Sequence, residues 1–259
     1  MREWEQVHGE SERAVYRAGS YGRKVPMSER PGVLLVDIVR SFTGYEGDDH
    51  LTSIAKFSTS CAPYAWKAMP FIVRLLTAAR ELGVPVVYTR NAKMLPVLRQ
   101  ARSWRKLRTR GRPGEERTTS ANGEPWRVVD AITHGTTFDE GSQFPEEIAP
   151  QPGDVVVEGP KASKFYGSPL LDVLQQLGVE HLIVGGVSTS GCVRGTVYDA
   201  SNYNFDVTIV EECVFDRFPT SNKVNLFDMN AKYASVRPLS DVLTDLEASL
   251  RAPVASARR

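Results

Sequence analysis

The chain has 259 residues, of which 41% are hydrophobic and 24% are charged, and 32 basic residues against 31 acidic ones leave a net charge of +1. This is the composition of an ordinary globular protein, and a chain of this length can bury a sizeable core without disulfide bonds. The near-neutral charge argues against a protein whose main task is to bind nucleic acid. No apolar run approaches the roughly 20 residues that a membrane-spanning helix needs.

Cysteine usage favours a reducing compartment. The three cysteines are Cys61, Cys192 and Cys213, an odd and sparse set. The N-terminus lacks the charged and then apolar pattern of a secretory signal. We therefore expect free thiols and a cytoplasmic protein.

The first half of the chain contains one clear βαβ unit. Residues 1–30 are polar, without a sustained hydrophobic period, and are predicted to form an N-terminal arm. The aliphatic run at 32–39 predicts a strand buried on both faces, in which Asp37 is the one acidic residue. Apolar residues at helical spacing predict a helix over 65–82, and a second strand follows at 84–89.

The alternation stops at residues 90–126, which we interpret as a surface insertion. Its stretch 98–112 concentrates basic charge around Trp104. A patch for an anionic ligand or for nucleic acid is one interpretation. A solvated helix face or a contact between subunits is the simpler one, and we favour it.

Strands and helices alternate again after residue 153. The predicted elements are strands at 154–158, 181–187 and 206–211 and helices at 169–177 and 192–203. This alternation predicts a single three-layer α/β/α domain over 31–250, with a central, mainly parallel sheet and helices on both faces. Residues 251–259 are expected to form a tail.

Three residues with useful chemistry are expected at the carboxyl ends of the strands, where open α/β sheets bind their ligands. Asp37 ends the first strand, Lys161 follows the strand at 154–158, and Cys192 lies in a turn from strand to helix. The start of a helix and a nearby lysine both favour a thiolate, and amides in a turn of small residues can stabilise an oxyanion. Singly, the three could be a helix cap, a surface lysine and a small buried residue. Together they predict nucleophilic catalysis.

Several segments resemble the isochorismatase-like cysteine hydrolase family. They are residues 34–37 (LLVD), 163–170 (SKFYGSPL) and, most specifically, 189–200 (TSGCVRGTVYDA). Within the family the likeness is greatest to the N-carbamoylsarcosine amidohydrolases, which residues 212–217 and 224–229 also resemble. The resemblance spans about residues 15–240 and implies the Rossmann-like fold of that family.

The resemblance also implies a catalytic triad of aspartate, lysine and cysteine. Cys192 would be the nucleophile, and Asp37 the general base that later protonates the leaving amine. A non-proline cis peptide bond of the family maps to Val187–Ser188 and would turn the Ser188 and Cys192 amides into an oxyanion hole. Arg217 matches the position that grips the substrate carboxylate, a task suited to a guanidinium group.

The lysine of the triad is where this sequence departs from the family, because the corresponding position is Gly159. Side chains of an extended chain alternate, so residues 159, 161 and 163 would share one face and Lys164 would point away. We therefore expect Lys161 to take the place of the missing lysine. The alternative is that no lysine reaches the thiol.

No metal and no cofactor are expected. Nicotinamidases related to this family bind zinc through an aspartate and two closely spaced histidines. The histidines of this chain are scattered along the sequence, at His8, His50, His134 and His181.

The sequence therefore favours a metal-independent hydrolase that cleaves a linear C–N bond of a small amide, carbamoyl or ureido compound bearing a carboxylate, through a thioester. The competing hypothesis, which Gly159 favours, is a catalytically weakened or inactive protein that binds a small molecule. The resemblance implies a homo-oligomer, a tetramer or a dimer, and neither nucleic acid nor a membrane is expected as a partner. Loops from the unmatched region 90–145 are expected to set the specificity.

Overall fold

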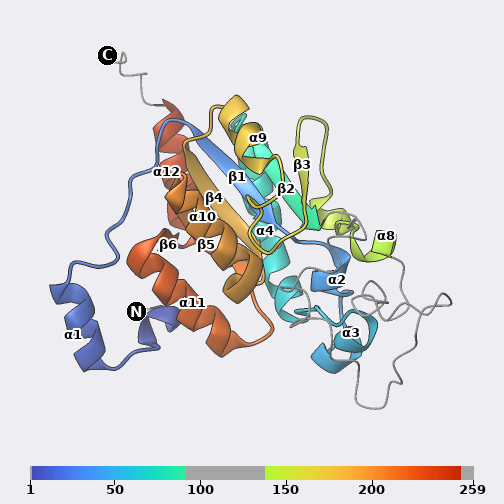
Figure 1. The fold of residues 1–259 in the computed structure, drawn as a ribbon, viewed down its shortest axis with the longest axis horizontal. Helices are drawn as coiled ribbons and strands as arrows, with labels where there is room; N and C mark the ends of the chain where they lie inside the picture. The colour runs from blue at the N-terminus through green and yellow to red at the C-terminus, as the bar shows by residue number, and fades with distance from the viewer. Residues whose placement is uncertain (1, 92–137, 252–259) are drawn as a thin grey trace.

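A central sheet of six parallel strands, in the order β3-β2-β1-β4-β5-β6, forms the middle layer of the protein (Figure 1). This computed structural model describes residues 2–91 and 138–251. The strands are β1 (Pro31–Val36), β2 (Val86–Asn91), β3 (Val155–Gly159), β4 (His181–Val187), β5 (Asp206–Phe215) and β6 (Ser235–Arg237). The prediction of a three-layer α/β/α fold with a parallel sheet is confirmed.

Helices cover both faces of this sheet (Figure 1). The helices of the described residues are α1 (Glu10–Ala18), α2 (Arg40–Thr43), α3 (His50–Lys56), α4 (Tyr64–Glu81), α8 (Phe138–Gly141), α9 (Leu170–Gln176), α10 (Arg194–Asn202), α11 (Pro219–Lys232) and α12 (Leu239–Arg251), of which α1 and α3 lie away from the sheet. Short 3-10 helices lie at Glu3–Gln6 and Glu146–Ile148, and a π-helical turn spans Thr189–Val193. Within the described residues, no helix is long and apolar enough to cross a membrane.

The alternation of side chains along β1 separates two hydrophobic cores. Val33 and Leu35 belong to the core on one face, and Leu34 and Val36 belong to the core on the other, all four with no exposed surface. Strands buried on both faces read as continuous aliphatic runs, which is why this strand was recognisable in the sequence.

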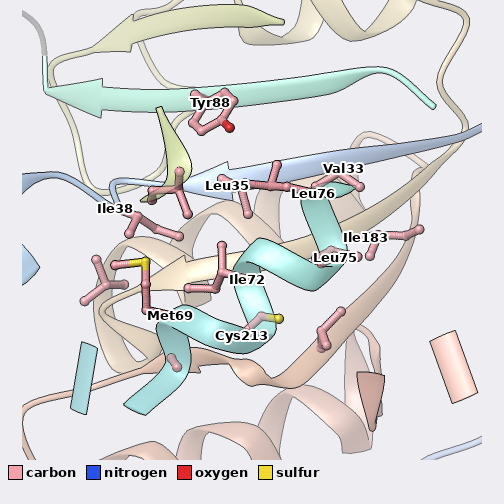
Figure 2. Packing of buried hydrophobic residues seen from close by; sticks show 14 of the residues in the cluster. Val33, Leu35, Ile38, Met69, Ile72, Leu75, Leu76, Tyr88, Ile183 and Cys213 are labelled. Carbon is pink, nitrogen blue, oxygen red and sulfur yellow. The ribbon is translucent and has the colours of Figure 1, made fainter. Parts of the chain in front are cut away.

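Helix α4 and helix α12 cover the first face. Figure 2 shows Met69, Ile72, Leu75 and Leu76 of α4 directed at the sheet. Their three- and four-residue spacing places them on one side of the helix. The second face is covered by α9, α10 and α11, which contribute aliphatic side chains such as Leu174 of α9.

The structure adds detail to two predicted segments, the N-terminal arm at 1–30 and the insertion that was expected to begin at residue 90. The segment expected as an arm contains a 3-10 helix and α1, and its Trp4 is buried and donates a hydrogen bond from Nε1 to Glu211 Oε2 at 2.7 Å. Arg90 and Asn91, assigned to the insertion, belong to β2 and pair with β3. The rest of the insertion, including the basic stretch 98–112 with Trp104, and the tail after residue 251 lie outside the described residues.

Gly186 lets the ends of β1 and β4 approach each other. It pairs with Val36, and its backbone φ of 140° lies in a region that L side chains rarely adopt. A Cβ added at Gly186 would lie 2.3 Å from the Val36 carbonyl oxygen and 2.8 Å from Val36 Cβ. Position 186 therefore has room only for glycine, directly before the turn that carries Cys192.

We expect Gly186→Ala to lower the free energy of unfolding by about 3 kcal/mol, since it adds a steric clash to backbone strain. Gly178→Ala is the matched control, because Gly178 has a φ of 67° but nothing within 4 Å of an added Cβ. The control should lose only about 1 kcal/mol. Urea unfolding measures both values, and equal losses would contradict the role assigned to the β1–β4 contact.

Candidate active site

Asp37 follows β1 at the carboxyl edge of the sheet and is completely buried. Its backbone has a φ of 55°, in the left-handed region where aspartate is one of the few tolerated residues. Thr89 of β2 donates a hydrogen bond from its hydroxyl to Asp37 Oδ1 at 3.1 Å. The Asp37 amide in turn lies 3.2 Å from Thr89 Oγ1 and donates to it. The neighbouring strand thus fixes the orientation of the carboxylate.

Lys164 supplies the positive charge beside this carboxylate. Its Nζ lies 2.7 Å from Asp37 Oδ2, and both side chains have no exposed surface. The same ammonium donates a hydrogen bond to Asn91 Oδ1 at 3.1 Å. A buried charge is expensive unless it is paired and hydrogen-bonded, and both charges here meet that condition.

The structure corrects the expectation that Lys161 would occupy this place. That expectation assumed an extended chain beyond Gly159, whereas β3 ends at Gly159 and the chain then turns. Alternation of side chains no longer applies in a turn, so Lys164 reaches inward and Lys161 stays partly exposed. The Lys164 amide donates to Thr196 Oγ1 at 3.1 Å, which attaches the turn to α10.

Cys192 lies in the turn from β4 to α10, as expected; this turn is π-helical, and α10 begins at Arg194 rather than at Cys192. The cis peptide bond expected between Val187 and Ser188 is present. The Ser188 carbonyl accepts hydrogen bonds from the amides of Gly191 at 2.9 Å and Val193 at 3.2 Å. A Cβ at Gly191 would lie 2.6 Å from Ser188 Oγ, so any larger residue there would displace the Ser188 hydroxyl. Ser188 and Cys192, the residues expected to form the oxyanion hole, therefore share one compact turn.

Asp216 holds this turn against the end of β5 and was not identified from the sequence as a site residue. Its carboxylate is buried, and Oδ2 accepts hydrogen bonds from the amide of Ser190 at 2.8 Å and from its hydroxyl at 2.6 Å. The strand was predicted to end at Glu211, but β5 continues to Phe215, so Asp216 stands at the same sheet edge as Asp37. Asp37 was identified because it follows the carboxyl end of a strand. The same reasoning would have identified Asp216 if the end of β5 had been predicted correctly.

The surroundings of Cys192 oppose ionisation of its thiol, whereas the sequence pattern favoured a thiolate. Burial, the negative charge of Asp37 and a hydrogen bond to that carboxylate raise the pKa of the Cys192 thiol well above its usual range. The positive charges of Lys164 and Arg217 act in the opposite direction but do not outweigh these effects. Cys192 is nevertheless partly exposed, whereas Cys61 and Cys213 are buried.

Arg217 follows Asp216 and reaches towards the loop before α4. It donates a hydrogen bond to the Thr59 carbonyl at 2.6 Å, and its side chain is only partly buried. Its charge partly opposes the rise that burial causes in the pKa of both the Cys192 and the Cys61 thiol. A guanidinium group therefore lies near the thiol and retains hydrogen-bond donors beyond the one that Thr59 uses.

Within residues 2–91 and 138–251, no three His, Cys, Asp or Glu side chains form a group that could hold a metal ion. His181 is buried between strands, where its Nε2 pairs with Thr208 Oγ1 at 2.8 Å. His50 contacts the rings of Tyr64 and Phe218. His134 lies outside the described residues.

Comparison with known proteins places these residues in a family. Residues 32–241 match the model of the isochorismatase domain. The chain is 28% identical to maleamate amidohydrolase of Pseudomonas putida over 228 residues, which cover 88% of this chain and 92% of that protein. It is also 28% identical to N-carbamoylsarcosine amidase of an Arthrobacter species over 235 residues, or 91% of this chain and 78% of that one.

A solved structure of a cysteine hydrolase from Pseudomonas syringae shares the fold. It superposes with a TM-score of 0.69 at 21% sequence identity, over 87% of this chain and 97% of its own. The match of the domain model covers most of the chain, including Asp37, Lys164, Cys192 and Arg217. The chain therefore belongs to the isochorismatase family.

Proposed function

We propose that this protein is a cysteine hydrolase that cleaves a linear C–N bond of a small amide, carbamoyl or ureido compound bearing a carboxylate. The observation that supports it best is the buried Asp37–Lys164 ion pair beside a partly exposed Cys192. Two similar proteins are named for amide hydrolysis, and both maleamate and N-carbamoylsarcosine are small carboxylates. The same proposal includes a cytoplasmic location and assembly into a dimer or a tetramer.

The reaction begins with the transfer of the thiol proton. As Sγ of Cys192 attacks the substrate carbonyl, its proton passes to the Asp37 carboxylate, which a raised thiol pKa makes necessary. The amides of Ser188 and Cys192 stabilise the oxyanion of the tetrahedral intermediate. Asp37 then gives the proton to the leaving nitrogen, and the C–N bond breaks. Ammonia or an amine departs, and the acyl group remains bound to sulfur as a thioester.

Water completes the cycle. Asp37 takes a proton from the water that attacks the thioester, the C–S bond breaks, and the proton returns to sulfur. Lys164 holds the Asp37 carboxyl group in position for these transfers, because its ammonium contacts Oδ2 directly. Arg217 binds the substrate carboxylate through its guanidinium group.

The alternative of an inactive binding protein depended on Gly159 leaving the site without a lysine. Lys164 supplies an ammonium at Asp37, so the reason for that alternative no longer applies. Binding of a small carboxylate without release of ammonia or amine would still favour it.

Cys192→Ala should lower the release of ammonia from maleamate and from N-carbamoyl amino acids by about 10³-fold or more, because the nucleophile is lost. Cys213→Ala is the control, since Cys213 is buried in the core under α4 and should keep its activity. Acid quenching during turnover and mass spectrometry should detect the acyl group on the Cys192 peptide. Equal rates for the two variants would remove Cys192 from the mechanism.

Asp37→Asn should slow turnover and yet speed up alkylation of Cys192 by iodoacetamide. Asparagine tolerates the left-handed backbone of position 37. Loss of the Asp37 charge lowers the raised pKa of the thiol, so more thiolate is present at a given pH below that pKa. Turnover should fall about 10²- to 10⁴-fold because the general base is gone.

Alkylation is followed on the Cys192 peptide by mass spectrometry between pH 6 and pH 10, chosen as about the range over which thiols titrate. Slower alkylation in Asp37→Asn than in the wild type would show that Asp37 favours the thiolate. The proposed protonated resting thiol would then be wrong.

Arg217→Lys should raise KM for carboxylate-bearing substrates by about tenfold to a hundredfold with a smaller change in kcat, because lysine keeps the charge but loses the bidentate geometry. The matched substrate is the corresponding neutral amide, whose KM should not change. An equal rise in KM for both substrates would show that Arg217 does not bind the carboxylate.

A further inference from the structure

Gly159 ends β3 at a closely packed position, where the side chain of Lys164 and Ser168 Cβ fill the space beside its Cα. Gly159 is buried and pairs with Asn91, the residue whose side chain accepts a hydrogen bond from Lys164 Nζ. A Cβ built on Gly159 would lie 3.7 Å from Lys164 Cδ and 3.3 Å from Ser168 Cβ. Any longer side chain at position 159 would therefore compete with Lys164 for the same volume.

The backbone of Lys164 is fixed independently of its ammonium. Its amide donates to Thr196 of α10, and its carbonyl accepts a hydrogen bond from the Ser168 hydroxyl. The turn lies so close to α10 that a Cβ at Gly195 would be 3.3 Å from the Ser163 amide nitrogen. Attachment at both the amide and the carbonyl gives the lysine one direction, past Gly159 and on to Asp37.

We infer that Gly159 and Lys164 form one functional unit, in which the absence of a side chain on β3 lets the turn that follows supply the cation of the active site. This inference rests on the proposed function only in assigning the cation a part in catalysis. Position 159 and position 164 are then alternative origins for the same ammonium. The added Cβ at 159 would lie 3.7 Å from Lys164 Cδ, which is two bonds from Nζ, so a lysine at 159 would start beside the path that the Lys164 side chain follows.

The exchange of the two residues tests this inference. Four proteins are compared: the wild type, Lys164→Ala, Gly159→Lys and the double variant Gly159→Lys/Lys164→Ala. Lys164→Ala removes the ammonium, and Gly159→Lys places two lysine side chains in one space. The double variant removes the Lys164 stem and provides an ammonium from the strand, so it should regain what each single variant loses.

The first readout is alkylation of the Cys192 peptide at pH 8, which needs no substrate. Loss of the Lys164 charge raises the pKa of the Cys192 thiol further, and we expect alkylation of Lys164→Ala to slow by about tenfold to a hundredfold. Alkylation of the double variant should be at least about tenfold faster than alkylation of Lys164→Ala. Two independent sites would not show such a coupling. A double variant as slow as Lys164→Ala, with a native circular dichroism spectrum, would overturn the inference.

Gly159→Val covers the case in which the double variant does not fold. Valine adds no charge and suits a strand end, but its branches reach into the path of Lys164. Alkylation of Cys192 should slow in Gly159→Val almost as much as in Lys164→Ala, and Gly159→Ala should lie between Gly159→Val and the wild type. A Gly159→Val protein with wild-type alkylation would show that Lys164 does not depend on this space.

Release of ammonia is the second readout, and it separates the two proposals. If alkylation follows the expected pattern but none of the proteins hydrolyses amide, carbamoyl or ureido compounds, the proposed function fails and the unit of Gly159 and Lys164 stands. If the wild type is active and the double variant recovers neither alkylation nor turnover, the inference fails and the proposed function stands.

Discussion

The active site depends on one buried ion pair, between Asp37 and Lys164 at 2.7 Å. Two charges without exposed surface are costly to desolvate, and their mutual attraction alone does not ensure a net gain. Hydrogen bonds from Thr89 to Asp37 and from Lys164 to Asn91 satisfy further polar atoms of the pair. These side-chain contacts join the ends of β1 and β2 to the turn that follows β3. Removing either charge would leave the other buried and unpaired, so the pair couples stability to catalysis.

The sheet order explains why these residues meet a cysteine that is distant in the sequence. Successive strands after β1 are added on one side up to β3 and on the other side from β4 to β6. Ligands of open α/β sheets bind where this order reverses, outside the carboxyl ends of the strands. Asp37 leaves β1 and the Cys192 turn leaves β4, the two strands on either side of that point. Gly186 allows the close approach, and Asp216 at the end of β5 fixes the turn. The scaffold therefore determines the meeting of carboxylate and thiol before any substrate is present.

The sequence was sufficient to predict the parallel sheet and the edge at which Asp37 and Cys192 lie, because both follow from strands with a strong apolar pattern. It was insufficient for Lys164, since the alternation of side chains holds only while the chain is extended and β3 ends at Gly159. The end of β5 was missed because Glu211 and Glu212 interrupt its apolar run, and a register shift occurs where β5 pairs with β4. Each failure lies where a local pattern gives way to a contact between distant segments. Backbone irregularity is also concentrated there, in the left-handed Asp37 and the π-helical turn.

The electrostatic balance of the site favours a mechanism in which the nucleophile is formed only during the reaction. A cysteine at a helix start with a lysine nearby would usually be a thiolate. Here the Asp37 carboxylate offsets the positive charge of Lys164 through their ion pair, and it also repels negative charge on the Cys192 sulfur. A thiol kept in its neutral form resists alkylation and oxidation, both of which need the thiolate. In the proposed mechanism, a carbonyl bound in the site accepts the electron pair of sulfur while Asp37 accepts the proton, so that negative charge moves from Asp37 to the new oxyanion. In that mechanism the Asp37–Lys164 pair both opposes a thiolate at rest and holds the carboxyl group that receives the proton.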